Sequence, residues 1–231
     1  MRPVQKLPHP LDANGNPKSY SPYGKAKPDL VETLGDYCSY CEVFTIFVAI
    51  EVEHILPKSV FPSLQEEWDN FLLSCKTCNT IKSNIVFDLS DVYLPHQNNT
   101  AISLQYQEGG TVSVPTALSN LQQEKAKKLI NLVGLDRVPG HPLLTAADKR
   151  WHYRRQAWEL AMRYLAKFEA GQADEDTVCD LASQRGFWSV WMSVFAVHSS
   201  VRKKMIKKFV GTAATCFDAA TTPIFRNGLE L

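Results

Sequence analysis

The 231-residue chain contains no hydrophobic run long enough to span a bilayer. Its longest mostly apolar stretches, residues 43–50 and 187–197, are shorter than the roughly 20 residues that a transmembrane helix requires. It also shows no apolar N-terminal segment ending in small residues, which is the pattern of a secretory signal. These absences predict a protein that neither enters a membrane nor is exported, and we expect it in the cytoplasm.

The chain also lacks an excess of charge of either sign. It has 25 Lys and Arg against 24 Asp and Glu, for a formal net charge of +1. A nucleic-acid-binding domain that acts alone is usually more basic. If the protein binds nucleic acid, its positive charge is therefore concentrated locally or a partner supplies part of the contact.

Cysteine is scarce, and its spacing indicates a metal site rather than a disulfide framework. Four of the six cysteines form the pairs Cys38-Ser-Tyr-Cys41 and Cys75-Lys-Thr-Cys78. Two thiolates separated by two residues can bind one ion from a tight turn, and zinc prefers four such ligands in a tetrahedron. The pairs therefore predict a structural zinc site, since all four positions would be filled. Cys179 and Cys216 stand alone and are expected to be small core residues.

Several polar residues lie between and just after the two cysteine pairs. The segment Glu53-His54-Ile-Leu-Pro57-Lys58 is followed by Trp68-Asp-Asn70 and an apolar run, and Asn79 and Lys82 follow the last cysteine. This order, over residues 38–82, resembles the HNH endonuclease family. The resemblance implies a ββα-metal fold in which one strand ends at His54, a second covers Phe71–Ser74, and a helix begins near Cys78.

The same resemblance assigns a role to each residue. His54 would be the general base that activates water, and Asn70 would orient it. Glu53 and Asn79 would bind the catalytic divalent ion. Asparagine stands here where the family often has histidine, and glutamate where many members have aspartate. Such oxygen ligands favour Mg²⁺ or Mn²⁺ and leave the choice between them open.

Phosphodiester hydrolysis independently requires an activated water, a Lewis acid and stabilisation of the leaving oxygen. Lys58 and Lys82 are candidate phosphate contacts, because lysine acts as a mobile point charge. Simpler interpretations remain for three residues: a structural role for His54, a turn for Asn70 and a helix cap for Asn79. Two basic clusters, within residues 149–167 and 202–208, could track phosphates or simply form solvated helix faces.

The wider pattern predicts an α+β protein in three parts. Residues 1–30 are a proline-rich arm, residues 31–115 are the zinc-stapled HNH domain, and residues 116–231 are helical. Strand-forming residues lie within 43–53 and 71–74. Helices are expected over 119–133, opened by a Ser119–Gln122 capping box, and over 145–170, 174–184, 187–197 and 201–210.

Beyond the motif, the arm and C-terminal segments such as Gly186-Phe-Trp-Ser-Val-Trp-Met resemble nuclease subunits of Septu-type anti-phage systems, which also occur beside retrons. That resemblance implies an ATPase partner of the SMC/ABC-like class in a hetero-oligomeric defence complex. The arm or the apolar C-terminal helices would dock the partner. DNA is the favoured substrate, with an RNA-directed nuclease, for instance against tRNA, as an alternative. A non-catalytic zinc-binding module is a third possibility.

Overall fold

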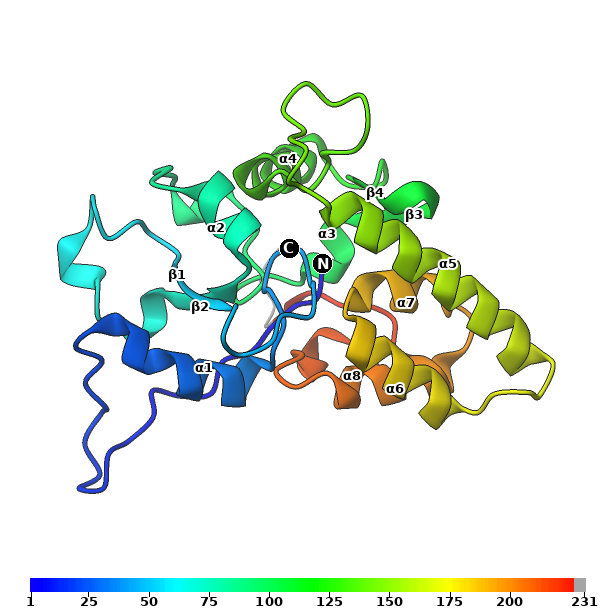
Figure 1. Ribbon diagram of the computed structural model, residues 1–231, viewed down its shortest axis with the longest axis horizontal. Helices are drawn as coiled ribbons and strands as arrows, with labels where there is room; N and C mark the ends of the chain where they lie inside the picture. Colours follow the sequence, from blue (N-terminus) through cyan, green and yellow to red (C-terminus); the bar gives the residue numbers. More distant parts are fainter. Residues whose placement is uncertain (227–231) are drawn as a thin grey trace.

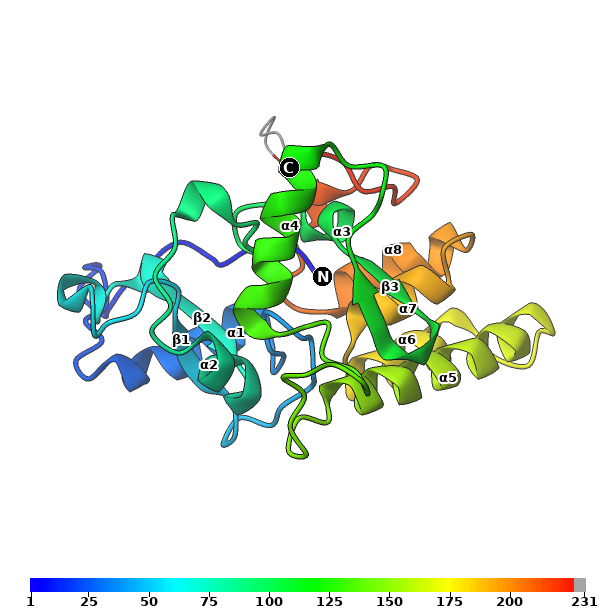
Figure 2. The same cartoon turned by 90° about the horizontal axis from the view of Figure 1, so that it is seen from above.

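A computed structural model describes residues 1–226 and shows two groups of elements (Figure 1). The hairpin of residues 51–74 and the helices of residues 27–34 and 76–82 lie on one side, and the helices within residues 150–208 lie on the other. The helix of residues 120–133 lies between them in the second view (Figure 2). The strands are β1 (Glu51–His54), β2 (Phe71–Ser74), β3 (Gln105–Gln107) and β4 (Thr111–Ser113). The helices are α1 (Lys27–Leu34), α2 (Lys76–Lys82), α3 (Thr100–Ser103), α4 (Asn120–Val133), α5 (Arg150–Glu169), α6 (Glu175–Arg185), α7 (Trp188–Val194) and α8 (Ser199–Lys208).

The predicted ββα arrangement is confirmed. β1 pairs with β2 in an antiparallel hairpin whose register sets Glu51 opposite Ser74 and His54 opposite Phe71. β2 is completely buried, as its run of apolar residues requires. α2 follows directly and packs against β1. The strand covers only the last part of the segment 43–53, because residues 43 and 44 make isolated bridges to Gly186 and Tyr37 instead.

The N-terminal arm is partly helical, which the proline content did not predict. α1 begins at Lys27 with Pro28 in its first turn, where the missing N–H costs nothing. It packs against β1 and β2. The first residues of the arm are extended and enter the interior: Met1, Arg2 and Val4 are buried, and Val4 bridges to Thr212. The start of the arm therefore packs into the body, whereas residues 11–17 are exposed.

The helical part follows the predicted pattern with shifted ends. The capping box of Ser119 and Gln122 opens α4, and Gly134 ends it in the left-handed conformation. α5 begins at Arg150 rather than 145. The Thr145 backbone oxygen accepts from the Asp148 N–H in an isolated turn, and the Asp148 carboxylate bonds to the Arg150 side chain. α7 ends at Val194 and α8 at Lys208, both earlier than predicted.

Two hydrophobic clusters hold these elements together. The larger combines the arm, the hairpin, α1 and the apolar face of α4, including Leu129 and Val133. The smaller joins α5 to α8 around Trp188 and Trp191. α4 thus packs with the hairpin side, although it was predicted as part of the helical segment 116–231. In residues 1–226, every helix is too short or too polar to cross a membrane.

Candidate active site and metal centre

The four paired cysteines converge on one point between the two halves of the ββα unit. Cys38 and Cys41 lie in the loop after α1, and Cys75 and Cys78 lie at the start of α2. All four are buried and unbridged, and their sulfur atoms lie within 4.8 Å of one another. A tetrahedral zinc–thiolate site with bonds of about 2.3 Å has sulfurs about 3.8 Å apart, and the Cys41 and Cys75 sulfurs are 3.6 Å apart. The donor set and spacing therefore fit zinc.

Each cysteine pair closes a small turn of its own. The Cys41 N–H points at the Cys38 sulfur and the Cys78 N–H at the Cys75 sulfur, both at 3.5 Å. The second contact is also the N-cap of α2, so the proposed metal ligand begins the helix. With four protein ligands, such a site is structural and leaves no position for a substrate.

Glu53 forms a buried ion pair with Lys82. The Lys82 Nζ lies 2.7 Å from the Glu53 carboxylate, and both side chains are almost completely buried. Burial raises the pKa of Glu53 to about 7, and the positive charge of Lys82 opposes that shift. Lys82 also donates to the backbone oxygen of His54 at 2.7 Å. Its ammonium supports the end of β1 from inside, so it is not available to a phosphate at the surface.

His54 ends β1 and has a defined tautomer. Its Nε2 lies 3.0 Å from the backbone oxygen of Gln65. A carbonyl can only accept, so Nε2 carries the proton and Nδ1 keeps its lone pair. The rings of Tyr23 and Phe71 pack edge-on against the imidazole. Burial lowers the pKa of His54, reinforced by the charges of Lys58 and Lys82. The neutral form, which a general base requires, is favoured.

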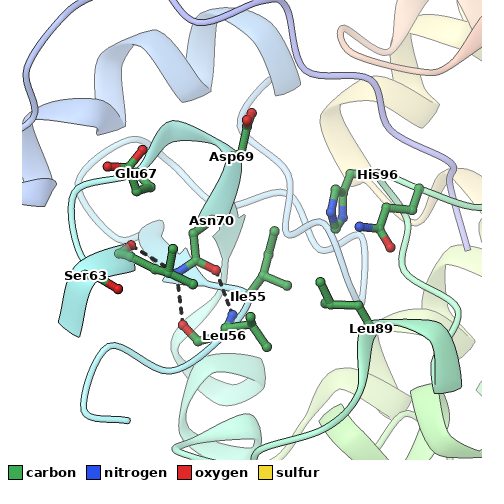
Figure 3. A pocket seen from close by; sticks show the side chains of 10 residues that line it. Ile55, Leu56, Ser63, Glu67, Asp69, Asn70, Leu89 and His96 are labelled. Atoms are coloured by element: carbon green, nitrogen blue, oxygen red, sulfur yellow. Dashed lines mark hydrogen bonds between the residues drawn. The ribbon is translucent and has the colours of Figure 1, made fainter. Parts of the chain in front are cut away.

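The Asn70 side chain bonds to backbone groups of Leu56 and Leu64, and the His54 ring bonds to Gln65. The Asn70 Oδ1 accepts from the Leu56 N–H at 2.8 Å, and its Nδ2 donates to the oxygens of Leu56 and Leu64 at 3.0 and 3.1 Å (Figure 3). These bonds tie the loop that follows His54 to the segment that carries Gln65, the acceptor of the His54 proton. The geometry is consistent with an indirect orienting role for Asn70.

Asn79 faces the cleft from α2 and is held by a residue that sequence reasoning missed. Its Nδ2 donates to Glu51 Oε2 at 2.7 Å. That bond leaves the Asn79 Oδ1 free to act as a ligand. Glu51 and Glu53 lie two residues apart on β1 and therefore point to the same face. Their spacing was the signal that could have identified Glu51.

One cleft of about 240 Å³ brings most of the predicted residues together. Its lining includes Glu53, His54, Lys58 and Asn79, with Tyr23 from the arm. The Lys58 Nζ lies over the Tyr23 ring, 3.9 Å from its centroid. Asn70 and Lys82 are not in this lining and support the cleft from behind. Asn70 lines a different pocket, of about 460 Å³, with His96 on its opposite wall (Figure 3).

The structure bears on the two basic clusters differently. Arg150 and Arg154 are buried, so neither can track phosphates on the surface of α5. On α8, Lys204 and Lys208 pair with Asp176 and Asp180 of α6 at 2.6 and 2.5 Å. Two of the five cations within residues 202–208 therefore form ion pairs between α8 and α6.

Comparison with known proteins agrees with this geometry. The family model described as HNH endonuclease matches residues 38–84, which span both cysteine pairs and the cleft. A segment of 76 residues is 41% identical to the Septu protein PtuB of Bacillus thuringiensis. That segment covers 32% of this chain and 29% of the relative. The likeness therefore spans less than a third of the relative's length.

Proposed function

We propose that this chain, which carries an HNH endonuclease domain at residues 38–84, is a metal-dependent endonuclease that hydrolyses phosphodiester bonds of nucleic acid, with DNA as its substrate. The observation that carries the proposal is the convergence of a carboxylate, a neutral histidine and an amide oxygen on one cleft. Glu53, His54 and Asn79 all line it. The cysteine site beside it fixes the elements that present these three residues.

In this proposal His54 is the general base. Its Nδ1 takes a proton from the attacking water, while the Nε2–H stays bonded to the Gln65 oxygen and keeps the ring in place. General-base catalysis of this kind contributes about 10²–10⁴ in rate. Lys58, which lines the cleft, would contact a substrate phosphate, and Lys82 would instead keep Glu53 in position.

The oxygen donors of Glu53 and Asn79 fit a hard divalent ion such as Mg²⁺ or Mn²⁺. Both line the cleft, and the Glu51 bond turns the Asn79 amide nitrogen away, so that its oxygen is the free donor. When bound, such an ion would polarise the scissile phosphate and stabilise the leaving oxygen. The protein itself holds Asn79, Glu53 and His54 together in the lining of one cleft.

The likeness to PtuB supports a role in anti-phage defence. We propose an SMC/ABC-like ATPase as the partner in a hetero-oligomeric cytoplasmic complex, and the near-neutral net charge of +1 is consistent with a shared substrate grip. Residues 1–4 and α7 are largely buried within this chain. They are therefore occupied internally, and a partner would have to dock on other surfaces.

The test compares wild type with His54→Ala in the presence of Mg²⁺ or Mn²⁺, alone and with the ATPase. Plasmid DNA and total RNA are offered as separate substrates, and zinc content and folding are measured on each protein. We expect cleavage of DNA to fall by about 10²-fold or more in His54→Ala, with zinc retained. His152→Ala, on α5, is the matched control and should cleave like wild type.

Equal cleavage by wild type and His54→Ala would rule out the base assigned here. Cleavage of RNA alone, lost in the same variant, would favour the RNA-directed alternative. Bound zinc without cleavage of either substrate, even with the ATPase, would favour the non-catalytic module.

A further inference from the structure

Arg150, the first residue of α5, reaches the cysteine site from a distant part of the chain. Its side chain is buried, and Nη1 lies 3.1 Å from the Cys78 sulfur. The two residues are 72 positions apart in sequence. The contact therefore links the helical segment directly to the proposed zinc ligands.

The guanidinium is fully satisfied where it lies. Nε and Nη2 bond to the Asp148 carboxylate at 2.9 and 2.6 Å. Nη1 also donates to the Val133 oxygen at 2.7 Å, and Nη2 to the Gly134 oxygen at 2.8 Å. Together with the sulfur contact, these bonds use all five N–H groups of an arginine. A guanidinium held on every side cannot rotate away from the sulfur without breaking several bonds.

The Cys78 sulfur differs from the first cysteine of each pair in where its hydrogen bond comes from. In each pair the first cysteine accepts an N–H from its own turn, as Cys38 and Cys75 do. The Cys78 sulfur, itself fully buried, takes its hydrogen bond from Arg150 instead. Four thiolates around one zinc ion carry a net charge of −2, and burying such charge without charged or hydrogen-bonding partners is costly.

We propose that Arg150 is a positioning residue of the zinc site, through which the fold of α4 and α5 controls how tightly the metal is held. The hydrogen bond fixes the Cys78 sulfur in the position that the coordination tetrahedron requires. The site is then not contained within residues 31–115. Outer partners of metal ligands typically change metal affinity by about 10–100-fold when they are removed.

Arg154 provides a matched control for a purely architectural role. It lies one turn further along α5, is also buried, and donates to the backbone oxygens of Gly110 and Leu135 at 2.7 and 2.8 Å. No sulfur is among these partners. Its charge also acts on Cys41, but its loss removes no hydrogen bond to a metal ligand.

The experiment measures zinc release from full-length wild type, Arg150→Met and Arg154→Met with a chromogenic chelator. Charge-transfer absorption of the Co²⁺-substituted proteins is recorded as a second readout. We expect Arg150→Met to release zinc at least about 10-fold faster and to shift the sulfur-to-cobalt band. Arg154→Met should release zinc more slowly than Arg150→Met and keep the wild-type spectrum.

Should Arg150→Met fail to fold, Arg150→Lys against Arg154→Lys carries the same comparison, because lysine keeps the charge but not the fork of donors. Equal release rates for the Arg150 and Arg154 variants would overturn the proposal, as would an unchanged cobalt spectrum in the Arg150 variant. Neither result depends on nuclease activity. The proposal can therefore fail while the proposed function stands, and the reverse.

Discussion

The backbone oxygen of Gln65 determines which nitrogen of His54 carries the proton. By accepting from Nε2, it fixes the proton on the nitrogen remote from the reaction and leaves Nδ1 basic. The loop that supplies this oxygen is itself held by Asn70. At the residue scale, Gln65 and Asn70 thus set the tautomer and orientation of the proposed base without lining its cleft.

Asn70→Asp tests this indirect control. Aspartate keeps the acceptor for the Leu56 N–H but cannot donate to the oxygens of Leu56 and Leu64. We expect cleavage to fall at least about 10-fold and stability to drop by about 1–3 kcal/mol from unsatisfied buried groups. Asn98→Asp is the control, since Asn98 uses its oxygen to accept from the Leu94 N–H and aspartate preserves that bond. Wild-type cleavage rates in Asn70→Asp would contradict the orienting role.

Glu51 should determine how well Asn79 binds the catalytic ion. Glu51→Leu removes the acceptor that holds the Asn79 nitrogen and frees the amide to rotate, whereas Glu51→Gln keeps an acceptor oxygen. We expect about a 10-fold higher Mn²⁺ concentration for half-maximal cleavage in Glu51→Leu, and a smaller change in Glu51→Gln. Direct Mn²⁺ binding followed by electron paramagnetic resonance separates weakened binding from slowed chemistry. Identical Mn²⁺ dependence in wild type and Glu51→Leu would exclude this role.

At the element scale, the hairpin and α2 are too small to be stable alone. A two-stranded hairpin is marginal in water, and α2 is a helix of only 7 residues. The cysteine site joins the loop after α1 to the N-terminus of α2, and α1 and α4 cover the hairpin and α2 from outside. The positions of the cleft residues therefore depend on the cysteine site that holds these elements together.

Removing the metal should loosen this unit first. Binding of a structural zinc supplies on the order of 10 kcal/mol that couples to folding. We expect Cys75→Ser, or chelation of wild type, to lower the melting temperature. Residues 51–54 and 71–82 should then lose protection from hydrogen exchange before α5 to α8 do. Cys179→Ser, at a buried cysteine of α6 outside the cluster, should retain zinc. Uniform loss of protection across all helices would contradict a local clamp.

At the scale of the whole molecule, Glu42 joins three distant parts of the chain. Its buried carboxylate accepts from the Arg2 N–H at 2.5 Å, and from the N–H and hydroxyl of Ser189 at 2.8 and 2.6 Å. Ser189 lies in the first turn of α7, where negative charge is favourable. The arm, the first cysteine turn and α7 therefore meet at one buried carboxylate, which links them by hydrogen bonds.

Acid stability should depend on His96, which faces charges from both ends of the chain. Burial, with the charges of Lys6 and Arg226, lowers the pKa of His96 to about 3. Between pH 3 and the ordinary pKa of about 6.5, His96 is protonated in the unfolded state but neutral in the folded state. The free energy of unfolding therefore falls as the pH drops below 6.5.

We expect His96→Gln to recover about 2 kcal/mol of that loss between pH 7 and pH 5. Urea unfolding of wild type and variant at both pH values measures the difference. Comparing the two proteins cancels the contribution of Glu53, whose raised pKa of about 7 favours the folded state at lower pH. Parallel pH profiles for the two proteins would contradict a role for His96.

The sequence by itself determined the features that depend on neighbours along the chain. Two residues between cysteines suit one ion, and Ser119 with Gln122 opens α4, because these contacts close within a single turn. The order of Glu53, His54, Asn70 and Asn79 likewise predicted the HNH domain and its ββα unit.

Only the tertiary structure decided which partners those residues have. The ion pair of Lys82 with Glu53, the hydrogen bond from Asn79 to Glu51 and the contact of Arg150 with Cys78 join segments 28 to 72 residues apart. Such contacts depend on how elements pack rather than on local preference. Lys82, predicted as a phosphate contact, instead pairs with Glu53 in the interior. A buried charge is stable only with charged or hydrogen-bonding partners, and packing decides which partners are within reach.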